Sequence, residues 1–265
     1  MSVAWICIPS ARPAVEVRAF VDKWKSQGYG VALWRDTGAD PVECDYLMIG
    51  DYPGYARACN TLTRDVLSFD SDCDWCICAG DDTDPDPNKR ADEIAAECRK
   101  AFFLMAVGRL ADSRVTAGYP RDLKKEQIET FGVMQPTGDR FAEGSIDRIA
   151  GSPWIGREFC ERAYCGNGPY WHEYRHMFVD EEIMQVAMKL GVFWQRPDLT
   201  HLHHHFMRQS DAINSGAIGR PIPPHLVEAN SPAHWSRYQA IYLGRKAAGF
   251  PGHEPLVSVE ATHAN

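Results

Sequence analysis

Short apolar runs alternate with stretches of helical spacing along the first part of the chain. The apolar runs that predict buried strands are residues 3–8, 31–34, 46–49 and 75–79. The stretches that predict helices, with apolar side chains on one face, are residues 14–27, 57–67 and 92–109. Because strands and helices alternate, we expect an α/β fold with a mostly parallel sheet flanked by helices.

From residue 112 onward the alternation becomes irregular. The predicted elements there are short strands at 131–134 and 192–194 and helices at 180–190 and 235–248. The segment 214–230 contains three prolines after residue 220 and predicts a loop. The last dozen residues have no periodic pattern and predict a frayed end.

The composition is that of an ordinary globular protein, with 45% hydrophobic and 24% charged residues among 265. No apolar run is long enough to span a bilayer, and the N-terminal apolar patch has no basic flank typical of a signal peptide. We therefore expect a cytoplasmic protein without a membrane span. The net charge of -8 argues against a general nucleic-acid coat but leaves room for a local basic groove.

An aspartate cluster, Gly80-Asp81-Asp82-Thr83-Asp84, follows the predicted strand at 75–79 directly. Ligands of open α/β sheets bind at the carboxyl ends of the strands, which is where these side chains fall. Carboxylates spaced one residue apart can reach one hard cation, and Mg²⁺ or Mn²⁺ often bridges to substrate phosphates. The alternative is a solvated acidic turn that Asp86 extends.

The chain has nine cysteines, an odd number, and several lie in strand-like surroundings. Free buried thiols in a reducing compartment fit this pattern better than a disulfide framework. Cys73-x-x-Cys76-x-Cys78 leaves zinc as an alternative, but no second closely spaced pair stands nearby. Buried strand cysteines are therefore the preferred interpretation.

Three further segments frame the aspartate cluster along the chain. They are Ile8-Pro9-Ser10-Ala11-Arg12, Gly54-Tyr55-Ala56-Arg57-Ala58-Cys59-Asn60 and Phe178-Val179-Asp180-Glu181-Glu182-Ile183. In this order, over residues 3–206, the motifs resemble a glycosyltransferase of the GT-A fold, in particular phage and bacterial enzymes similar to glycosyltransferase family two. The second segment resembles the family's G-x-A-x-x-x-N helix start. The third resembles its E-D-x-E-L segment, with Val179 where the family usually has Glu.

The resemblance implies a GT-A type, Rossmann-like mostly parallel sheet and a nucleotide-sugar site. The residues that it assigns to nucleotide binding are Pro9, Ser10, Arg12, Asp36, Arg57, Asn60, Asp81 and Asp82. Asp82 and Asp84 match the D-x-D positions best and are the expected metal ligands, although Asp81 could shift this register by one residue. A helix start that carries an arginine also suits an anionic ligand on physical grounds.

Downstream, the resemblance implies that Asp180 is the general base that deprotonates the acceptor hydroxyl. Glu182 either shares this role or is structural. Without the resemblance, Asp180 predicts a helix N-cap, and both roles can hold at once. A histidine-rich segment, Thr200-His201-Leu202-His203-His204-His205, follows further downstream. The family's H-L-H pattern implies a third metal ligand at His203, with His204 or His205 as alternatives. The competing interpretation is a solvated histidine cluster.

The sequence thus predicts a metal-dependent glycosyltransferase that uses Mn²⁺ or Mg²⁺ and a nucleotide-sugar donor, for which a UDP-sugar is favoured. We expect residues 1–210 to form the catalytic domain and residues 211–265 a loop and helix packed on it. Localisation would be the host cytoplasm if the protein is encoded by a phage, and no obligate protein partner is expected.

The expected acceptor is a 5-hydroxymethylpyrimidine in phage DNA, which has to leave the base stack to reach the donor. A glycan or small-molecule acceptor is the alternative. The segments 151–154 and 166–172 carry aromatic side chains that suit an acceptor, and Arg157, Arg162 and Arg175 add positive charge near them. Two other classes remain open: a metal-dependent nucleotidyltransferase and a non-catalytic sugar- or nucleotide-binding module.

Overall fold

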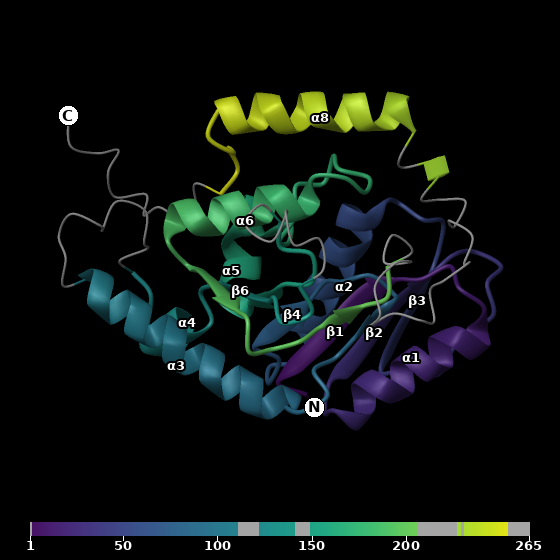
Figure 1. Ribbon diagram of the computed structural model, residues 1–265, viewed down its shortest axis with the longest axis horizontal. Coiled ribbons are helices and arrows are strands. Elements are labelled where there is room, and N and C mark those ends of the chain that lie inside the picture. The colour runs from purple at the N-terminus through teal and green to yellow at the C-terminus, as the bar shows by residue number, and fades with distance from the viewer. Residues whose placement is uncertain (1, 111–121, 141–148, 206–226, 229–230, 254–265) are drawn as a thin grey trace.

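Figure 1 shows the computed structural model of the chain, which describes residues 2–110, 122–140, 149–205, 227–228 and 231–253. One sheet has seven strands in the order β3-β2-β1-β4-β7-β6-β8, and a second sheet pairs β5 with β9. The strands of the large sheet are β1 (Ala4–Pro9), β2 (Gly30–Arg35), β3 (Tyr46–Ile49), β4 (Trp75–Ile77), β6 (Val133–Pro136), β7 (Trp154–Gly156) and β8 (Phe193–Arg196). Those of the small sheet are β5 (Thr83–Asp84) and β9 (Leu202–His203).

Helices cover the large sheet on both faces (Figure 1). They are α1 (Ala14–Ser26), α2 (Tyr55–Phe69), α3 (Ala91–Leu110), α4 (Lys125–Glu129), α5 (Arg157–Arg162), the 3₁₀ turn η2 (Ala163–Gly166), α6 (Val179–Leu190) and α8 (Pro232–Ala247). All neighbouring strands of the sheet run parallel except at β7, which is antiparallel to both β4 and β6. The expected α/β fold with a mostly parallel sheet is confirmed, with β7 as the exception.

The core has two parts because side chains alternate between the faces of each strand. On β1, Ile6 and Ile8 pack with α1 and α3, whereas Trp5 and Cys7 pack toward α2 and α6. The Trp5 ring lies over the neighbouring strand so closely that a Cβ on Gly30 would stand 2.4 Å from it. The two-sided burial explains why the strands are apolar throughout instead of alternating.

Several short elements are absent from the sequence expectations. They are α4, α5, η2, β7 and the two strands of the small sheet, β5 and β9. Elements of two to six residues are too short to establish a period, so only tertiary contacts define them. The strand expected at 75–79 ends at Ile77, and the chain then turns into β5. Apart from 227–228, the loop expected at 214–230 and the expected frayed end lie outside the described residues.

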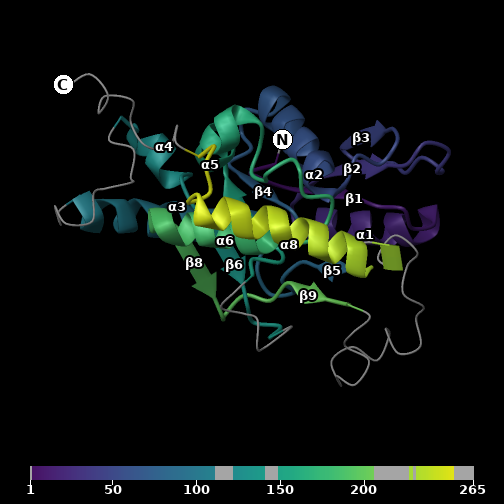
Figure 2. The ribbon, with the colours of Figure 1, turned by 90° about the horizontal axis from the view of Figure 1, so that it is seen from above.

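The C-terminal helix α8 lies over α6, as Figure 2 shows from above. It begins at a Ser231 cap, whose side chain accepts a hydrogen bond from the backbone N–H of His234, with Pro232 in the first turn. All nine cysteines are free, and seven of them are buried. In the part of the chain that the structure describes, no helix combines the length and apolar character needed to cross a membrane.

Candidate functional site

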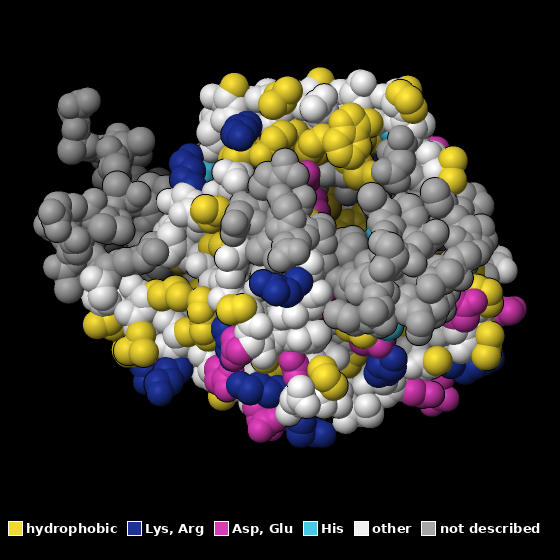
Figure 3. Space-filling view, in the orientation of Figure 1, with side chains coloured by type: hydrophobic (Ala, Val, Ile, Leu, Met, Phe, Trp, Pro, Cys, Tyr) yellow, Lys and Arg dark blue, Asp and Glu magenta, His cyan; other side chains and the backbone are white. Residues whose placement is uncertain are grey.

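Loops that follow the parallel strands β1 to β4 meet at one edge of the large sheet. The polar residues that this edge collects are Ser10 and Arg12 after β1, Asp36 after β2, Tyr52 after β3, and Asp81 and Asp82 after β4. Parallel strands end at the same edge of a sheet, which brings these four loops together. Figure 3 shows a hollow in the face of the molecule beneath α8, with hydrophobic and acidic side chains visible inside it.

Asp81 joins the loop after β1 to the loop after β4. The Ser10 hydroxyl donates a hydrogen bond to Oδ2 of Asp81 at 2.6 Å, and Nε of Arg12 donates to Oδ1 at 2.8 Å. Pro9 precedes this pair as the last residue of β1. Both oxygens of Asp81 are therefore engaged within the protein, which gives this carboxylate a loop-positioning role.

Arg35 supports the same loop from below and was missed by sequence reasoning. Its guanidinium is buried and donates to the carbonyl oxygens of Ser10 at 3.1 Å, Arg12 at 2.7 Å and Asp40 at 3.1 Å. A buried cation is tolerated when its donors are satisfied, as they are here by carbonyl oxygens. The one sequence signal was a charge at the end of an otherwise apolar strand.

Asp82 and His203 face each other where the small sheet meets the aspartate cluster. Oδ1 of Asp82 lies 3.1 Å from Nε2 of His203, and the carbonyl oxygen of Asp82 accepts from the backbone N–H of His204 at 2.7 Å. Burial alone would raise the pKa of Asp82, but the hydrogen bond and charge of His203, together with the charge of Arg12, outweigh it and lower the pKa to about 2. Asp82 is therefore ionised at neutral pH.

The missing side chain of Gly80 lets the Asp82 carboxylate approach the backbone closely. A Cβ at this position would stand 2.4 Å from Oδ1 of Asp82 and 3.5 Å from Nε2 of His203. Contacts below 3.0 Å force one group to move, so any larger residue would displace the Asp82 carboxylate. Glycine at position 80 therefore permits the observed position of the Asp82 carboxylate.

Asp84 belongs to a separate pair. Its Oδ2 lies 2.8 Å from Nε2 of His204 and 2.7 Å from Nζ of Lys23 on α1. The expected ligand set of Asp82, Asp84 and His203 is therefore divided between two neighbouring pairs. Among the residues that the structure describes, no three His, Cys, Asp or Glu side chains converge on one point.

The Asp82–His203 pair nevertheless suits a phosphate-bound cation. Mg²⁺ in nucleotide sites is held by one or two protein ligands, with substrate phosphates and water completing the shell. An ionised carboxylate and an imidazole in contact, next to Gly80, meet that requirement. The remaining histidine alternative, His205, has its ring centre 5.1 Å from that of His203.

The small sheet is fixed from below by aromatic side chains. Nε1 of Trp24 donates to the carbonyl oxygen of Thr83 at 3.0 Å, and Nε1 of Trp154 approaches Nε2 of His201 at 3.3 Å. Burial lowers the pKa of His201 to about 4, so this histidine is neutral and structural. Asp86 accepts from the backbone N–H of Thr200 at 2.7 Å and ties the loop before β9 to the aspartate cluster.

Arg57 and Asn60, expected at the nucleotide, instead hold the segment 168–172. The Asn60 side chain donates to the carbonyl oxygen of Tyr170 at 2.7 Å and accepts from its N–H at 3.0 Å, and Nε of Arg57 donates to the carbonyl oxygen of His172 at 3.1 Å. Gly168, with φ of 107°, has no room for a Cβ beside Asn60. The structure thus places both residues in a supporting role for this loop.

The N-terminus of α2 is likewise covered. The N–H of Tyr55 donates to the carbonyl oxygen of Arg175 at 2.6 Å, and Gly54 adopts φ of 100° where a Cβ would touch Arg175. The carbonyl oxygen of Arg175 therefore occupies the N–H group that an anion would otherwise bind at this helix start. The Arg175 side chain is itself exposed, with its guanidinium 5.9 Å from the ring centre of Tyr52.

Tyr52 links Asp36 to the rest of the edge. Burial raises the pKa of Tyr52 above its usual range, and the charges of Asp36 and Asp81 add to that rise, while Arg175 opposes it. All three charged groups are therefore close enough to Tyr52 to affect its ionisation. Neither Tyr52 nor its stacking on Arg175 was foreseen from the sequence.

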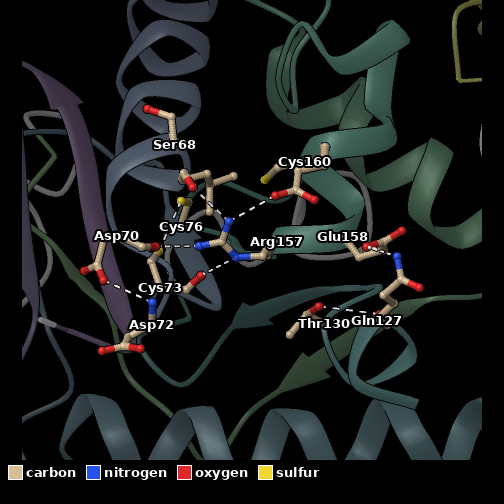
Figure 4. Close-up of polar contacts among 12 residues, drawn as sticks. Ser68, Asp70, Asp72, Cys73, Cys76, Gln127, Thr130, Arg157, Glu158 and Cys160 are labelled. Carbon is tan, nitrogen blue, oxygen red and sulfur yellow. Dashed lines mark hydrogen bonds and ion pairs between the residues drawn. The ribbon is translucent and has the colours of Figure 1, made fainter. Parts of the chain in front are cut away.

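Arg157, expected to add positive charge near an acceptor, lies elsewhere. Figure 4 shows its guanidinium at the end of α2, where it donates to the carbonyl oxygens of Leu67 at 2.9 Å, Asp70 at 2.6 Å and Cys73 at 2.8 Å. These carbonyl groups are left unpaired by the end of the helix and the following turn. Arg162 forms an ion pair with Glu158. Arg157 and Arg162 are therefore paired within the protein, and of the three arginines expected near an acceptor Arg175 is the exposed one.

Asp180 stands in the first turn of α6, and the helix begins at Val179 with Phe178 at the N-cap position. The N-cap lies two residues before Asp180, so the expectation that Asp180 is the N-cap is wrong. Oδ1 of Asp180 accepts from the N–H of Glu181 at 3.1 Å. Burial raises the pKa of Tyr170 and of Tyr242, and the charge of Asp180 adds a smaller contribution to both rises.

An aromatic pair lies beside the backbone that leads into the aspartate cluster. The ring centres of Tyr170 and Tyr55 are 6.0 Å apart, and the Tyr55 hydroxyl donates to the carbonyl oxygen of Ala79 at 3.3 Å. Ala79 immediately precedes Gly80 and Asp81. The aromatic pair thus packs against the strand end that leads into the aspartate cluster.

Glu182 is placed in a structural role. It is 1% exposed, and its carboxylate accepts from the hydroxyls of Tyr164 and Tyr174 at 2.6 Å each and from Nη2 of Arg245 at 2.7 Å. With every contact taken by protein donors, the carboxylate has no access to an acceptor hydroxyl. Of the two alternatives for Glu182, the structural one fits.

Comparison of the chain with protein-family models, with curated protein sequences and with solved structures finds no match. The function of the protein is therefore inferred from the side chains that the sheet edge brings together. The features available for that inference are the Ser10–Arg12–Asp81 anchor, the Asp82–His203 pair and Asp180 in the first turn of α6.

Proposed function

We propose that this protein is a metal-dependent glycosyltransferase with a GT-A type fold, which transfers a sugar from a nucleotide-sugar to an acceptor hydroxyl. The observation that carries the proposal is the 3.1 Å contact between the Asp82 carboxylate and His203 next to Gly80, at the carboxyl edge of the sheet. Two segments far apart in sequence meet there, as the resemblance to the family implies.

In this proposal, Asp82 and His203 hold Mn²⁺ or Mg²⁺ against the diphosphate of the donor. The cation supplies charge neutralisation for the nucleoside diphosphate that leaves when the sugar–phosphate bond breaks. Asp84 keeps its partner His204 in place instead of binding the cation directly. The nucleotide lies along the loops after β1, β2 and β3, with Asp36 and Tyr52 near its base and ribose.

Asp180 acts as the general base. The acceptor oxygen forms the new bond to the sugar carbon, the sugar–phosphate bond breaks, and the acceptor proton passes to the Asp180 carboxylate. The support is its position in the first turn of α6, where the resemblance to the family places the base. A UDP-sugar is the favoured donor.

We propose a 5-hydroxymethylpyrimidine in DNA as the acceptor, with a glycan or small molecule as the alternative. The test offers single-stranded oligonucleotides that contain hydroxymethylcytosine or hydroxymethyluracil, with UDP-, GDP- or CDP-sugars and Mn²⁺, and measures the nucleoside mass after digestion. A mass gain of one hexose that chelation abolishes is the expected result. Oligonucleotides with unmodified cytosine and thymine are the matched control.

Release of nucleoside diphosphate is followed in the same reactions. Release without any mass gain on DNA would remove the DNA acceptor and leave the glycosyltransferase assignment in place. No release from any nucleotide-sugar, with either cation and with glycan acceptors also supplied, would contradict the glycosyltransferase assignment itself.

A further inference from the structure

The segment 168–176 has neither helix nor strand, yet contacts with three helices hold it in place. The contacts are those of Asn60 with the backbone of Tyr170, of Arg57 with the carbonyl oxygen of His172, of the Arg245 guanidinium with the Trp171 ring at 3.7 Å, and of the Tyr174 hydroxyl with Glu182. Function often resides on irregular segments that a rigid scaffold positions. The side chains that this segment leaves exposed are therefore held in defined places.

Arg175 is the exposed cation of this segment, and it lies over the loop that follows β3. Its guanidinium stands 5.9 Å from the ring centre of Tyr52. Its carbonyl oxygen accepts a hydrogen bond from the N–H of Tyr55 at 2.6 Å, and a Cβ on Gly54 would stand 3.1 Å from its Cα. Both the backbone and the side chain of Arg175 are thus placed against the residues between β3 and α2.

Tyr55 also connects Arg175 with the end of β4. The hydroxyl of Tyr55 donates to the carbonyl oxygen of Ala79 at 3.3 Å, while the N–H of Tyr55 donates to Arg175. One tyrosine therefore separates the backbone of Arg175 from the strand end that leads into Gly80 and Asp82. Arg175 and the candidate cation pair belong to the same carboxyl edge of the large sheet.

The charge of Arg175 is not met within the described part of the chain, where its guanidinium forms no ion pair and no hydrogen bond. The two other arginines of this edge are satisfied, Arg12 by Asp81 and Arg35 by carbonyl oxygens. A guanidinium that lies over an aromatic ring keeps its N–H groups free for an external anion.

The shape of a guanidinium suits phosphate, because two parallel N–H groups can bind two oxygens of one group. A carboxylate would fit the same fork. A diphosphate has two anionic groups, so that one ligand can contact both an arginine and a cation held by Asp82 and His203. The shared edge therefore favours a diphosphate over a ligand with a single anionic group.

We propose that Arg175 binds the diphosphate of a nucleoside diphosphate at this edge, together with the cation at Asp82 and His203. The inference rests on the proposed function, because it takes the loop after β3 to be part of the donor site. It reassigns Arg175 from the acceptor, where the sequence suggested a basic side chain, to the donor.

The test measures binding of UDP, GDP, CDP and inorganic pyrophosphate to the full chain by isothermal titration calorimetry in the presence of Mn²⁺. Arg175→Gln should weaken binding of the preferred nucleoside diphosphate by about tenfold or more, because a lost charge-assisted, bidentate contact has that order of effect. Arg175→Lys keeps the charge but not the fork and should recover part of the loss. Arg64→Gln, the same change at an exposed position further along α2, is the matched control and should bind like the wild type.

Thermal unfolding of each variant separates lost binding from lost folding, and the exposed Arg175 side chain can be replaced without disturbing the core. Equal affinity of the wild type and Arg175→Gln for the preferred nucleoside diphosphate would overturn the inference, and the glycosyltransferase assignment would stand. If pyrophosphate binds as tightly as every nucleoside diphosphate and depends equally on Arg175, the diphosphate contact is supported and the nucleotide-sugar assignment is removed. A wild type that binds none of the four probes would overturn both.

Discussion

Three carboxylates that follow β4 have three different sets of partners. Asp81 accepts hydrogen bonds from Ser10 and Arg12, whereas Asp84 pairs with His204 and Lys23. Asp82 faces His203 next to Gly80, and its pKa of about 2 keeps it ionised. Partner geometry therefore singles out Asp82 as the residue for a cation, where the sequence spacing treated Asp82 and Asp84 alike.

Gly80→Ala tests the position of the Asp82 carboxylate. The added Cβ would stand 2.4 Å from Oδ1 of Asp82, so the carboxylate has to move, and we expect Mn²⁺-dependent nucleotide binding to fall by about tenfold or more. Gly108→Ala is the matched control, because a Cβ there meets nothing within 4 Å and helix α3 should gain about 0.5–1 kcal/mol. Isothermal titration calorimetry measures nucleotide binding by both variants, and urea denaturation measures the stability of Gly108→Ala. Unchanged binding in Gly80→Ala would place the cation elsewhere.

Asp180→Asn tests the base. The amide has the same shape but cannot accept the acceptor proton, so turnover should fall by about 10²–10⁴-fold. The affinity for the nucleotide-sugar should stay within about twofold, since Asp180 contacts the acceptor side in the proposal. Steady-state kinetics and donor titration give the two values. A variant that keeps wild-type turnover would exclude Asp180 as the base.

At the scale of elements, one buried ion pair fastens α8 to α6. Glu182 on α6 accepts from Arg245 on α8 and from the hydroxyls of Tyr164 and Tyr174. The same carboxylate therefore joins four segments of the chain around the first turn of α6. This arrangement connects the stability of the C-terminal helix with the position of Asp180.

Glu182→Gln removes one partner of this network and leaves the Arg245 guanidinium buried without its countercharge. We expect a loss of about 3–5 kcal/mol in the free energy of unfolding, measured by urea denaturation. In a double-mutant cycle with Arg245→Met, the double variant should be more stable than the sum of the two single losses predicts. Additive losses would mean that the two side chains do not interact as the structure shows.

The long elements were predictable because they carry a clear period. Helices α1, α3 and α6 and strands β1 to β3 lie within a few residues of their expected bounds. The strand β7, the turn η2 and the pairing of β5 with β9 were not predictable, because each is too short for a period and exists through its neighbours. The end of β4 at Ile77 was not predictable either, because Cys78 and Ala79 are as apolar as the strand and the sequence therefore predicts a strand up to Ala79.

At the scale of the whole molecule, the sheet edge that gathers the candidate site followed from the alternation of strands and helices. What could not be predicted was which side chains meet there. Asn60 reaches Tyr170, and Asp82 reaches His203, through contacts between segments far apart in sequence. Buried supports such as Arg35 carry no local pattern at all, because their role is set by the carbonyl groups that surround them.

The thiols give a test of the fold as a whole. All nine cysteines are free, Cys165 is exposed, and Cys44 is half-buried. In the native protein we expect Cys165 to react rapidly with a disulfide reagent and Cys44 to react more slowly, because burial protects the other seven thiols. After unfolding in guanidinium chloride, all nine thiols should react. Fewer than nine reactive thiols in the denatured state would show that disulfides form.

The central claim is that the sheet edge binds a nucleotide-sugar through a cation held by Asp82. The most direct measurement is the thermal unfolding of wild-type protein and Asp82→Asn with UDP-, GDP- and CDP-sugars, in the presence and absence of Mn²⁺. At saturation we expect one nucleotide-sugar to raise the Tm of the wild type by about 5 °C only when Mn²⁺ is present, and to leave Asp82→Asn unchanged. If no nucleotide-sugar raises the Tm of the wild type with any cation, the claim is contradicted.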